Sequence, residues 1–201
     1  MQLDVWSDFV CPWCYLAYTS VEKLAENHPV EVVWHSYELR PVGAPPMTKD
    51  KLTMIQQTLP RLKEIAKTQY GLTLDLGPLD INSRAAHVGA KFAASQGVGK
   101  AYHDAVYKAY WEQARSIDNV DLLQSIAESL GLDGAAFRAA LDDNTYIEQV
   151  DGDEEQAMAM QLGGVPALIF EQKYLVSGAQ PYEQLVNVVQ QIQQREGQNA
   201  Q

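Results

Sequence analysis

Short β-prone segments lie at both ends of the chain, and a long stretch with helical periodicity separates them. Residues 3–7 and 30–37 are rich in β-branched and aromatic side chains, which are typical of buried strands. Between them, apolar residues recur at helical spacing over residues 15–26. This order predicts a β-α-β unit with parallel strands.

The middle of the chain is predicted to be almost entirely helical. Three prolines within residues 41–46 break regular structure, and helical periodicity then continues from Thr48 to about residue 161. Either Asp118 or Asn119 is expected to cap one helix, Asp133 another, and Pro60 is expected to restart one. No internal repeat of roughly 20–50 residues is apparent. We therefore expect one inserted helical domain, residues 47–161.

After Gly163 and Gly164 the pattern returns to strands. Residues 167–170 and 173–176 are short apolar runs joined by a tight turn, which predicts a β-hairpin. Pro181 then begins an amphipathic helix that should cover one face of the sheet. Residues 1–46 and 162–201 are therefore expected to form one α/β domain around the insertion.

Composition and charge narrow the possible partners. The chain has 201 residues, 46% of them hydrophobic, which is enough for a substantial core. A net charge of −11 argues against nucleic acid or an anionic membrane surface as partner. The first residues do not resemble a secretory signal, and no apolar run approaches membrane-spanning length, so we expect a cytoplasmic protein.

The candidate chemistry lies in Cys11-Pro12-Trp13-Cys14, where the first strand gives way to a helix. Two cysteines with this spacing at such a turn are typical of thioredoxin-like redox proteins. The free N–H groups of a helix start should lower the pKa of Cys11, which predicts that Cys11 attacks and Cys14 resolves the mixed disulfide. Pro12 loses no helical hydrogen bond in the first turn.

Other uses of the two thiols are less well supported. A zinc site would need two further ligands, and the four histidines show no paired spacing, so we expect no metal. A purely structural disulfide would close too short a loop to add much stability. Trp13 could shape a substrate groove or simply pack against neighbouring loops.

Val165-Pro166 is the second informative position. A proline at the start of a strand is accommodated where no ladder donor is needed, and the peptide bond before it can be cis or trans. The sequence leaves that choice open.

Taken together, the chain resembles the DsbA family, and within it the FrnE-like branch of disulfide oxidoreductases. That branch is related to 2-hydroxychromene-2-carboxylate isomerases and kappa-class glutathione transferases. The matching segments span nearly the whole chain, and they are residues 8–16, 82–83, 163–166 and 177–181.

This resemblance implies a thioredoxin fold with a large all-helical domain inserted between the β-α-β unit and the C-terminal hairpin and helix. It implies that Cys11 is an exposed nucleophile, that Cys14 is its buried partner, and that Pro166 is a cis-proline facing them. Val165 would offer backbone hydrogen bonds to an extended substrate. No cofactor is implied, although glutathione could serve as a redox partner.

Two features depart from the family pattern. Some relatives have an acidic residue where this chain has Val5, so the proton acceptor for Cys14 is unassigned. An additional C-terminal cysteine pair is absent. We read Asp8 as a cap or turn residue, and His35 and His87 as structural. Asn82 and Ser83 are expected to cap a helix, and only the resemblance suggests that they line a pocket.

The resulting function is thiol–disulfide exchange with protein or small-thiol substrates, in a monomer or homodimer. Two alternatives stay open, because related isomerases and transferases often have serine where this chain has Cys11. One is glutathione-dependent isomerisation or conjugation of a small aromatic compound, and the other is a redox-linked holdase or binding module. The direction of electron flow does not follow from the sequence.

Overall fold

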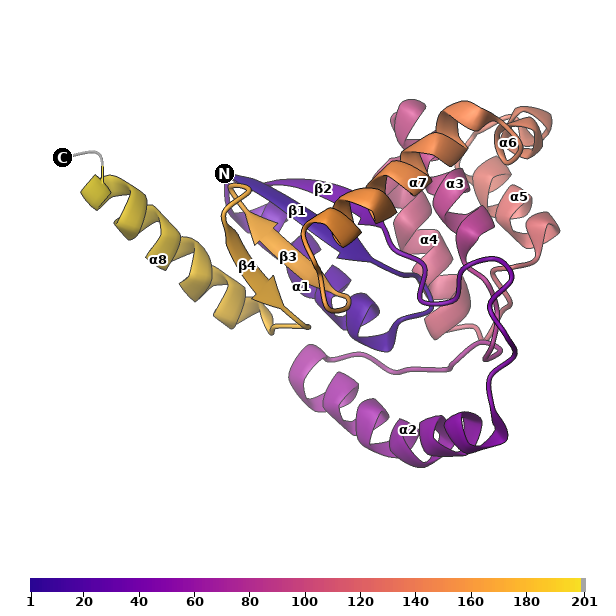
Figure 1. Cartoon of the computed structure of the whole chain (residues 1–201), viewed down its shortest axis with the longest axis horizontal. Helices are drawn as coiled ribbons and strands as arrows, with labels where there is room; N and C mark the ends of the chain where they lie inside the picture. The colour runs from indigo at the N-terminus through magenta and orange to yellow at the C-terminus, as the bar shows by residue number, and fades with distance from the viewer. Residues whose placement is uncertain (200–201) are drawn as a thin grey trace.

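A computed structural model describes residues 1–199 as an α/β fold built on one four-stranded sheet (Figure 1). The strands are β1 (Gln2–Ser7), β2 (Glu31–Ser36), β3 (Ala167–Phe170) and β4 (Tyr174–Ser177), in the order β2-β1-β3-β4. β1 is parallel to β2, whereas β3 is antiparallel to both of its neighbours. The predicted β-α-β unit and C-terminal hairpin are confirmed. Residues 200 and 201, the end of the predicted α/β domain, lie outside the described residues.

Alternate residues of β1 face different helices. Leu3 and Val5 lie in a buried core with Leu24 of α1 (Pro12–Asn27) and Leu185 of α8 (Tyr182–Asn199). On the other face, the indole N–H of Trp6 donates to the carbonyl of Asp153 in α7 (Asn144–Ala159), with an N···O distance of 2.9 Å. Helices therefore cover both faces, and the central strand is buried from Leu3 to Ser7.

The remaining helices form a second and larger core. They are α2 (Lys49–Tyr70), α3 (Arg84–Ser95), α4 (Gly99–Trp111), α5 (Val120–Ser129) and α6 (Gly134–Ala140). Helices α3 to α6 gather beside α7 at one end of the sheet, and α2 lies apart along one side (Figure 1). Within residues 1–199, no helix has both the length and the apolar character needed to cross a bilayer. The division at residues 46 and 161 stays a prediction, because α7 belongs to the predicted insertion and also covers the sheet.

The expectation that Pro60 restarts a helix is wrong, since α2 continues through it from Lys49 to Tyr70. A proline here leaves the carbonyl of Gln56 without its helical donor. Both residues are exposed, so water can replace the missing donor. Of the two candidates Asp118 and Asn119, Asn119 is the cap, and the predicted cap Asp133 is confirmed. Each side chain accepts a backbone N–H from the first turn of its helix.

A buried charged cluster ties α7 to the sheet. The carboxylate of Asp153 contacts the His35 ring at 2.8 Å and the Lys91 ammonium at 2.5 Å, and it accepts the Ser36 N–H at 2.7 Å. The other ring nitrogen of His35 lies 3.0 Å from Asp4, so His35 bridges two carboxylates. Burial raises the pKa of Asp153, but these contacts outweigh burial and hold the pKa below its usual value. The expected structural role of His35 agrees with this position.

We expect the stabilisation from Asp153 to depend on pH. Because its pKa is lower in the folded than in the unfolded state, the contribution is present above about pH 4 and is lost as the pH falls through the folded value. Asp153→Asn should lower the free energy of unfolding at pH 7 by about 2 kcal/mol, and the deficit should shrink near pH 3. Urea denaturation at both pH values measures this, with the exposed Asp142→Asn as control. A deficit of equal size at both pH values would contradict the assignment.

Candidate active site

Both cysteines lie at the start of α1, as the sequence predicts. Cys11 is the N-cap residue with extended backbone angles, and Pro12 occupies the first turn. The N–H of Cys11 donates to the Asp8 carbonyl at 3.1 Å, which closes the turn between strand and helix. Both thiols are free.

The environment of Cys11 favours its thiolate. Hydrogen bonding from the Cys14 thiol lowers the pKa of Cys11 most, burial opposes this, and the backbone N–H groups of Cys14 and Trp13 lower it further. Asp8 acts in the opposite direction through its negative charge, yet the pKa of Cys11 stays below its ordinary value. The helix start therefore stabilises an anion at the position where the sequence predicts one.

Cys14 has the opposite environment. The side chain is completely buried, and burial followed by the interaction with Cys11 raises its pKa well above the ordinary value. The Asp8 N–H points at the Cys14 sulfur at 3.4 Å. The two sulfurs therefore ionise unequally, Cys11 first and Cys14 with difficulty.

Cys11 is less accessible than the family resemblance implies. Its side chain is only 4% exposed, and its sulfur lies 3.7 Å from the carbonyl oxygen of Val165. The expectation of an exposed nucleophile is therefore wrong for this structure, in which the loop before β3 contacts the sulfur through the Val165 carbonyl. The Val165–Pro166 peptide bond is cis. The fold thus brings together Cys11, Cys14 and Val165-Pro166, which lie far apart in the sequence.

Two hollows flank the dithiol. The larger, about 590 Å³, lies between α2 and the start of α1, and Pro12 and Trp13 are part of its wall. Most of its other lining residues are apolar, among them Leu39, Ile55, Leu59, Leu62, Ile65 and Leu76. Trp13 is 43% exposed, which makes it available to a ligand. The smaller, about 270 Å³, is lined by residues 162–167 with Leu175, Ser177 and Gly178.

Polar residues behind the dithiol form a cluster that the sequence does not reveal. Asp8 is fully buried, and its carboxylate accepts the N–H groups of Val10 at 3.2 Å and Leu39 at 2.7 Å. The expected turn role is thus confirmed by the bond to Val10. His87 of α3 approaches the same carboxylate, with its Nε2 3.4 Å from Oδ1. Nothing in the spacing of these two residues signals that they meet beside Cys14.

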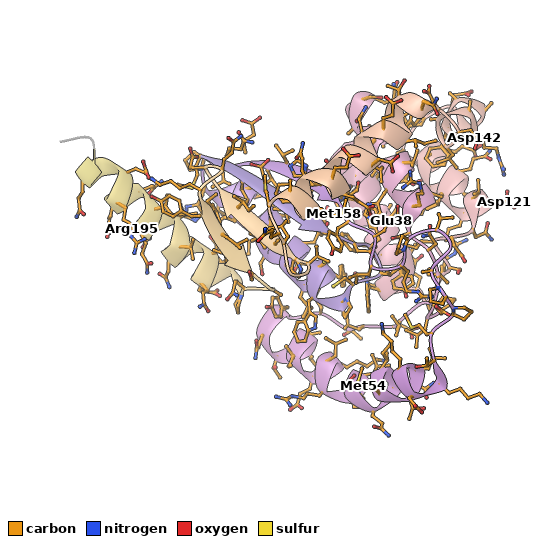
Figure 2. The ribbon with its side chains drawn as sticks, in the orientation of Figure 1. Glu38, Met54, Asp121, Asp142, Met158 and Arg195 are labelled. Carbon is orange, nitrogen blue, oxygen red and sulfur yellow. The ribbon has the colours of Figure 1, made fainter. Side chains whose placement is uncertain are left out.

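Asn82 and Ser83 lie at the start of α3. The side-chain amide oxygen of Asn82 accepts the Arg84 N–H at 2.8 Å, whereas Ser83, the N-cap residue, makes no side-chain cap bond. The Asn82 amide also donates to Glu38, whose position between the sheet and the helices is labelled in Figure 2. No group of three His, Cys, Asp or Glu side chains among residues 1–199 is arranged to hold a metal ion.

Comparison with known proteins places this site in a family. The model of the DSBA-like thioredoxin domain matches residues 2–190. The chain belongs to this family. The proteins similar to this DSBA-like chain include a probable DsbA oxidoreductase and a 2-hydroxychromene-2-carboxylate isomerase.

Three relatives show the range of similarity. The uncharacterized protein YwbO of Bacillus subtilis is 30% identical, over 73% of this chain and 74% of its own. A 2-hydroxychromene-2-carboxylate isomerase of Pseudomonas putida is 27% identical, over 84% of each chain. The crystal structure of a probable DsbA oxidoreductase from Streptomyces coelicolor superposes with a TM-score of 0.79 at 30% identity, covering 95% of this chain and 89% of that one.

We expect Cys14→Ala to raise the pKa of Cys11, because the Cys14 thiol is the largest single influence that lowers it. The rate of Cys11 alkylation by iodoacetamide, measured against pH, should then have its midpoint at a higher pH than in the unmodified protein. Ser20→Ala, at another buried position of α1, serves as the control and should leave the midpoint in place. An unchanged or lower midpoint in Cys14→Ala would show that the helix N–H groups alone stabilise the thiolate.

Proposed function

We propose that this DSBA-like protein catalyses thiol–disulfide exchange, with Cys11 as the attacking thiolate and Cys14 as the resolving thiol. The observation that carries the proposal is the unequal environment of the two sulfurs, since the pKa is lowered at Cys11 and raised at Cys14. Reactive cysteines are recognised by their stabilised thiolates. Membership of a family with oxidoreductase relatives supports the same chemistry.

The reaction takes two exchange steps when the dithiol is reduced. The Cys11 thiolate attacks one sulfur of a substrate disulfide, forms a mixed disulfide and releases the first substrate thiolate. Cys14 then loses its proton and attacks the Cys11 sulfur, which forms the Cys11–Cys14 disulfide and releases the second substrate thiolate. Two electrons pass to the substrate. The same steps in reverse oxidise a substrate dithiol.

The two hollows suggest how a substrate binds. An extended peptide beside Val165 would lie along the smaller hollow, where backbone groups precede β3. An apolar substrate side chain would enter the larger hollow beside Trp13. We therefore propose disulfide-bearing proteins or small thiols as substrates, with glutathione as a possible redox partner.

Substitution of the two cysteines should separate the two steps. We expect Cys11→Ser to reduce exchange with a peptide disulfide to the uncatalysed rate, because a hydroxyl does not form the stable mixed disulfide. Cys14→Ser should instead complete the first step and accumulate a mixed disulfide at Cys11 that mass spectrometry detects. Full exchange activity in Cys11→Ser would refute the proposal.

The larger hollow favours a second candidate, isomerisation of a small aromatic carboxylate. A relative that is 27% identical is named 2-hydroxychromene-2-carboxylate isomerase. The hollow is mostly apolar, and its wall includes Lys51 and Arg61, which would suit a carboxylate on an aromatic ring, whereas Arg40 in the same wall is paired with Asp80.

Isomerisation and disulfide exchange differ in whether they require glutathione and in whether they require Cys14. If isomerisation is the function, conversion of such a compound should require glutathione and should persist in Cys14→Ala. No conversion by the unmodified protein, with or without glutathione, would exclude it. Peptide-disulfide exchange measured on the same preparation provides the comparison.

A further inference from the structure

The resolving step requires an acceptor for the thiol proton of Cys14, and the two cysteines do not supply one. Cys14 attacks only as a thiolate, yet its side chain is completely buried and has no exposed surface from which to lose a proton to solvent. Its proton must pass to a neighbouring group. Three elements near the dithiol carry titratable side chains. These side chains are Asp8 in the loop after β1, His87 in α3, and His103, Tyr107 and Tyr110 in α4.

The residues of α4 are poor acceptors near neutral pH. Burial, together with the neighbouring His87 and Lys91, lowers the pKa of His103 to about 3, so its ring stays neutral and weakly basic. Burial raises the pKa of both Tyr107 and Tyr110, so both hydroxyls keep their own protons. Asp8 and His87 are the titratable neighbours that remain.

The backbone of Asp8 contacts Cys14, and the charge of the Asp8 carboxylate acts on the Cys14 thiol. The backbone N–H of Asp8 points at the Cys14 sulfur at 3.4 Å, and the N–H groups of Val10 and Leu39 fix its two carboxylate oxygens. Among residues 1–199, no lysine or arginine forms an ion pair with this carboxylate. The nearest basic group is the His87 ring at 3.4 Å, and this nitrogen is buried without a hydrogen-bond partner.

We propose that Asp8 accepts the proton of Cys14 during the resolving step and that His87 positions the Asp8 carboxylate for this transfer. In that step the Cys14 S–H bond breaks and its proton goes to Asp8, while the Cys14–Cys11 S–S bond forms and the bond from Cys11 to the substrate sulfur breaks. The substrate leaves as a thiolate and later takes up the proton. This inference rests on the proposed exchange reaction.

Removing the Asp8 carboxylate should change the rate of the resolving step in opposite directions, depending on whether Asp8 accepts the proton or acts only as a fixed negative charge. The negative charge of Asp8 raises the pKa of both cysteines. If Asp8 acted only as a fixed charge, removing it would make Cys14 ionise more easily and would speed the resolving step. If Asp8 accepts the proton, removing its carboxylate slows that step although the charge is gone.

Single-turnover reaction of the reduced protein with dithiobis(nitrobenzoate) resolves both steps. One coloured thiolate is released when Cys11 attacks, and a second is released when Cys14 resolves the mixed disulfide. We expect Asp8→Asn to slow the second release by about 100-fold near pH 7, the lower end of typical general-base effects. The deficit should shrink as the pH rises and Cys14 ionises without help. The first release should stay equal or become faster.

Controls separate the possible failures. Asp4→Asn removes another buried carboxylate of the same region, which contacts His35 on the α7 face, and it should leave both releases unchanged. A second release in Asp8→Asn as fast as in the unmodified protein, or faster, overturns the inference. Equal slowing of both releases at every pH overturns it too, because that is a structural effect. Release of only one thiolate by the unmodified protein would instead refute the exchange reaction itself.

His87 provides an independent test, which also applies if Asp8→Asn does not fold. We expect His87→Gln to slow the second release by about tenfold, with the first release unchanged. The loss should shrink as the pH rises, as in Asp8→Asn, because Cys14 then ionises without help from Asp8. An unchanged second release in His87→Gln overturns the assignment of the Asp8–His87 pair.

Discussion

The chemistry proposed for this protein depends on one constraint, which is that the start of α1 must hold the buried Cys14 thiol and its own free N–H groups against the Cys11 sulfur. The helical part of the chain holds this helix start in place. The indole N–H of Trp111 donates to the Phe9 carbonyl at 2.8 Å, and the Tyr15 hydroxyl donates to Glu112 at 2.7 Å. The inserted helices are therefore part of the support of the dithiol, and they also form one wall of the larger hollow.

The sheet supplies the opposite side of the site. β3 pairs with β1 in an antiparallel register that places Ala167 opposite Trp6, so the residues just before β3 reach the end of β1 where the dithiol turn begins. This register brings the Val165 carbonyl to within 3.7 Å of the Cys11 sulfur. Both faces of β3 are buried, and a slip of one residue would exchange the side chains that pack on the two faces, so the packing that fixes the sheet also fixes the site.

The sequence was sufficient for features that depend on local pattern, and insufficient for features that depend on long-range packing. Strand and helix periodicity predicted the β-α-β unit and the hairpin, and the position of Cys11 before a helix predicted the direction of its pKa shift. The contact between Asp8 and His87 was not predictable, because it requires the position of α3 relative to the first loop. The burial of Cys11 depends in the same way on a loop that follows most of the chain. The prediction at Pro60 was wrong because a proline destabilises a helix less where the carbonyl that loses its donor, here that of Gln56, is exposed to water.

The negative charge of Asp8 affects the stability of the Cys11 thiolate as well as the local hydrogen bonds. A more stable Cys11 thiolate favours the reduced dithiol and makes the pair more oxidising. The helix start and the Cys14 thiol act in that direction, whereas the Asp8 charge acts against it at both cysteines. In the proposed exchange, Asp8 should therefore make the pair less oxidising than it would be without this charge. Among residues 1–199 no lysine or arginine pairs with this buried carboxylate, which makes its burial costly to stability, and the two N–H bonds that it accepts reduce this cost. The proposed transfer of the Cys14 proton to Asp8 gives a reason for keeping at this position a carboxylate that is unfavourable both for thiolate formation and for burial.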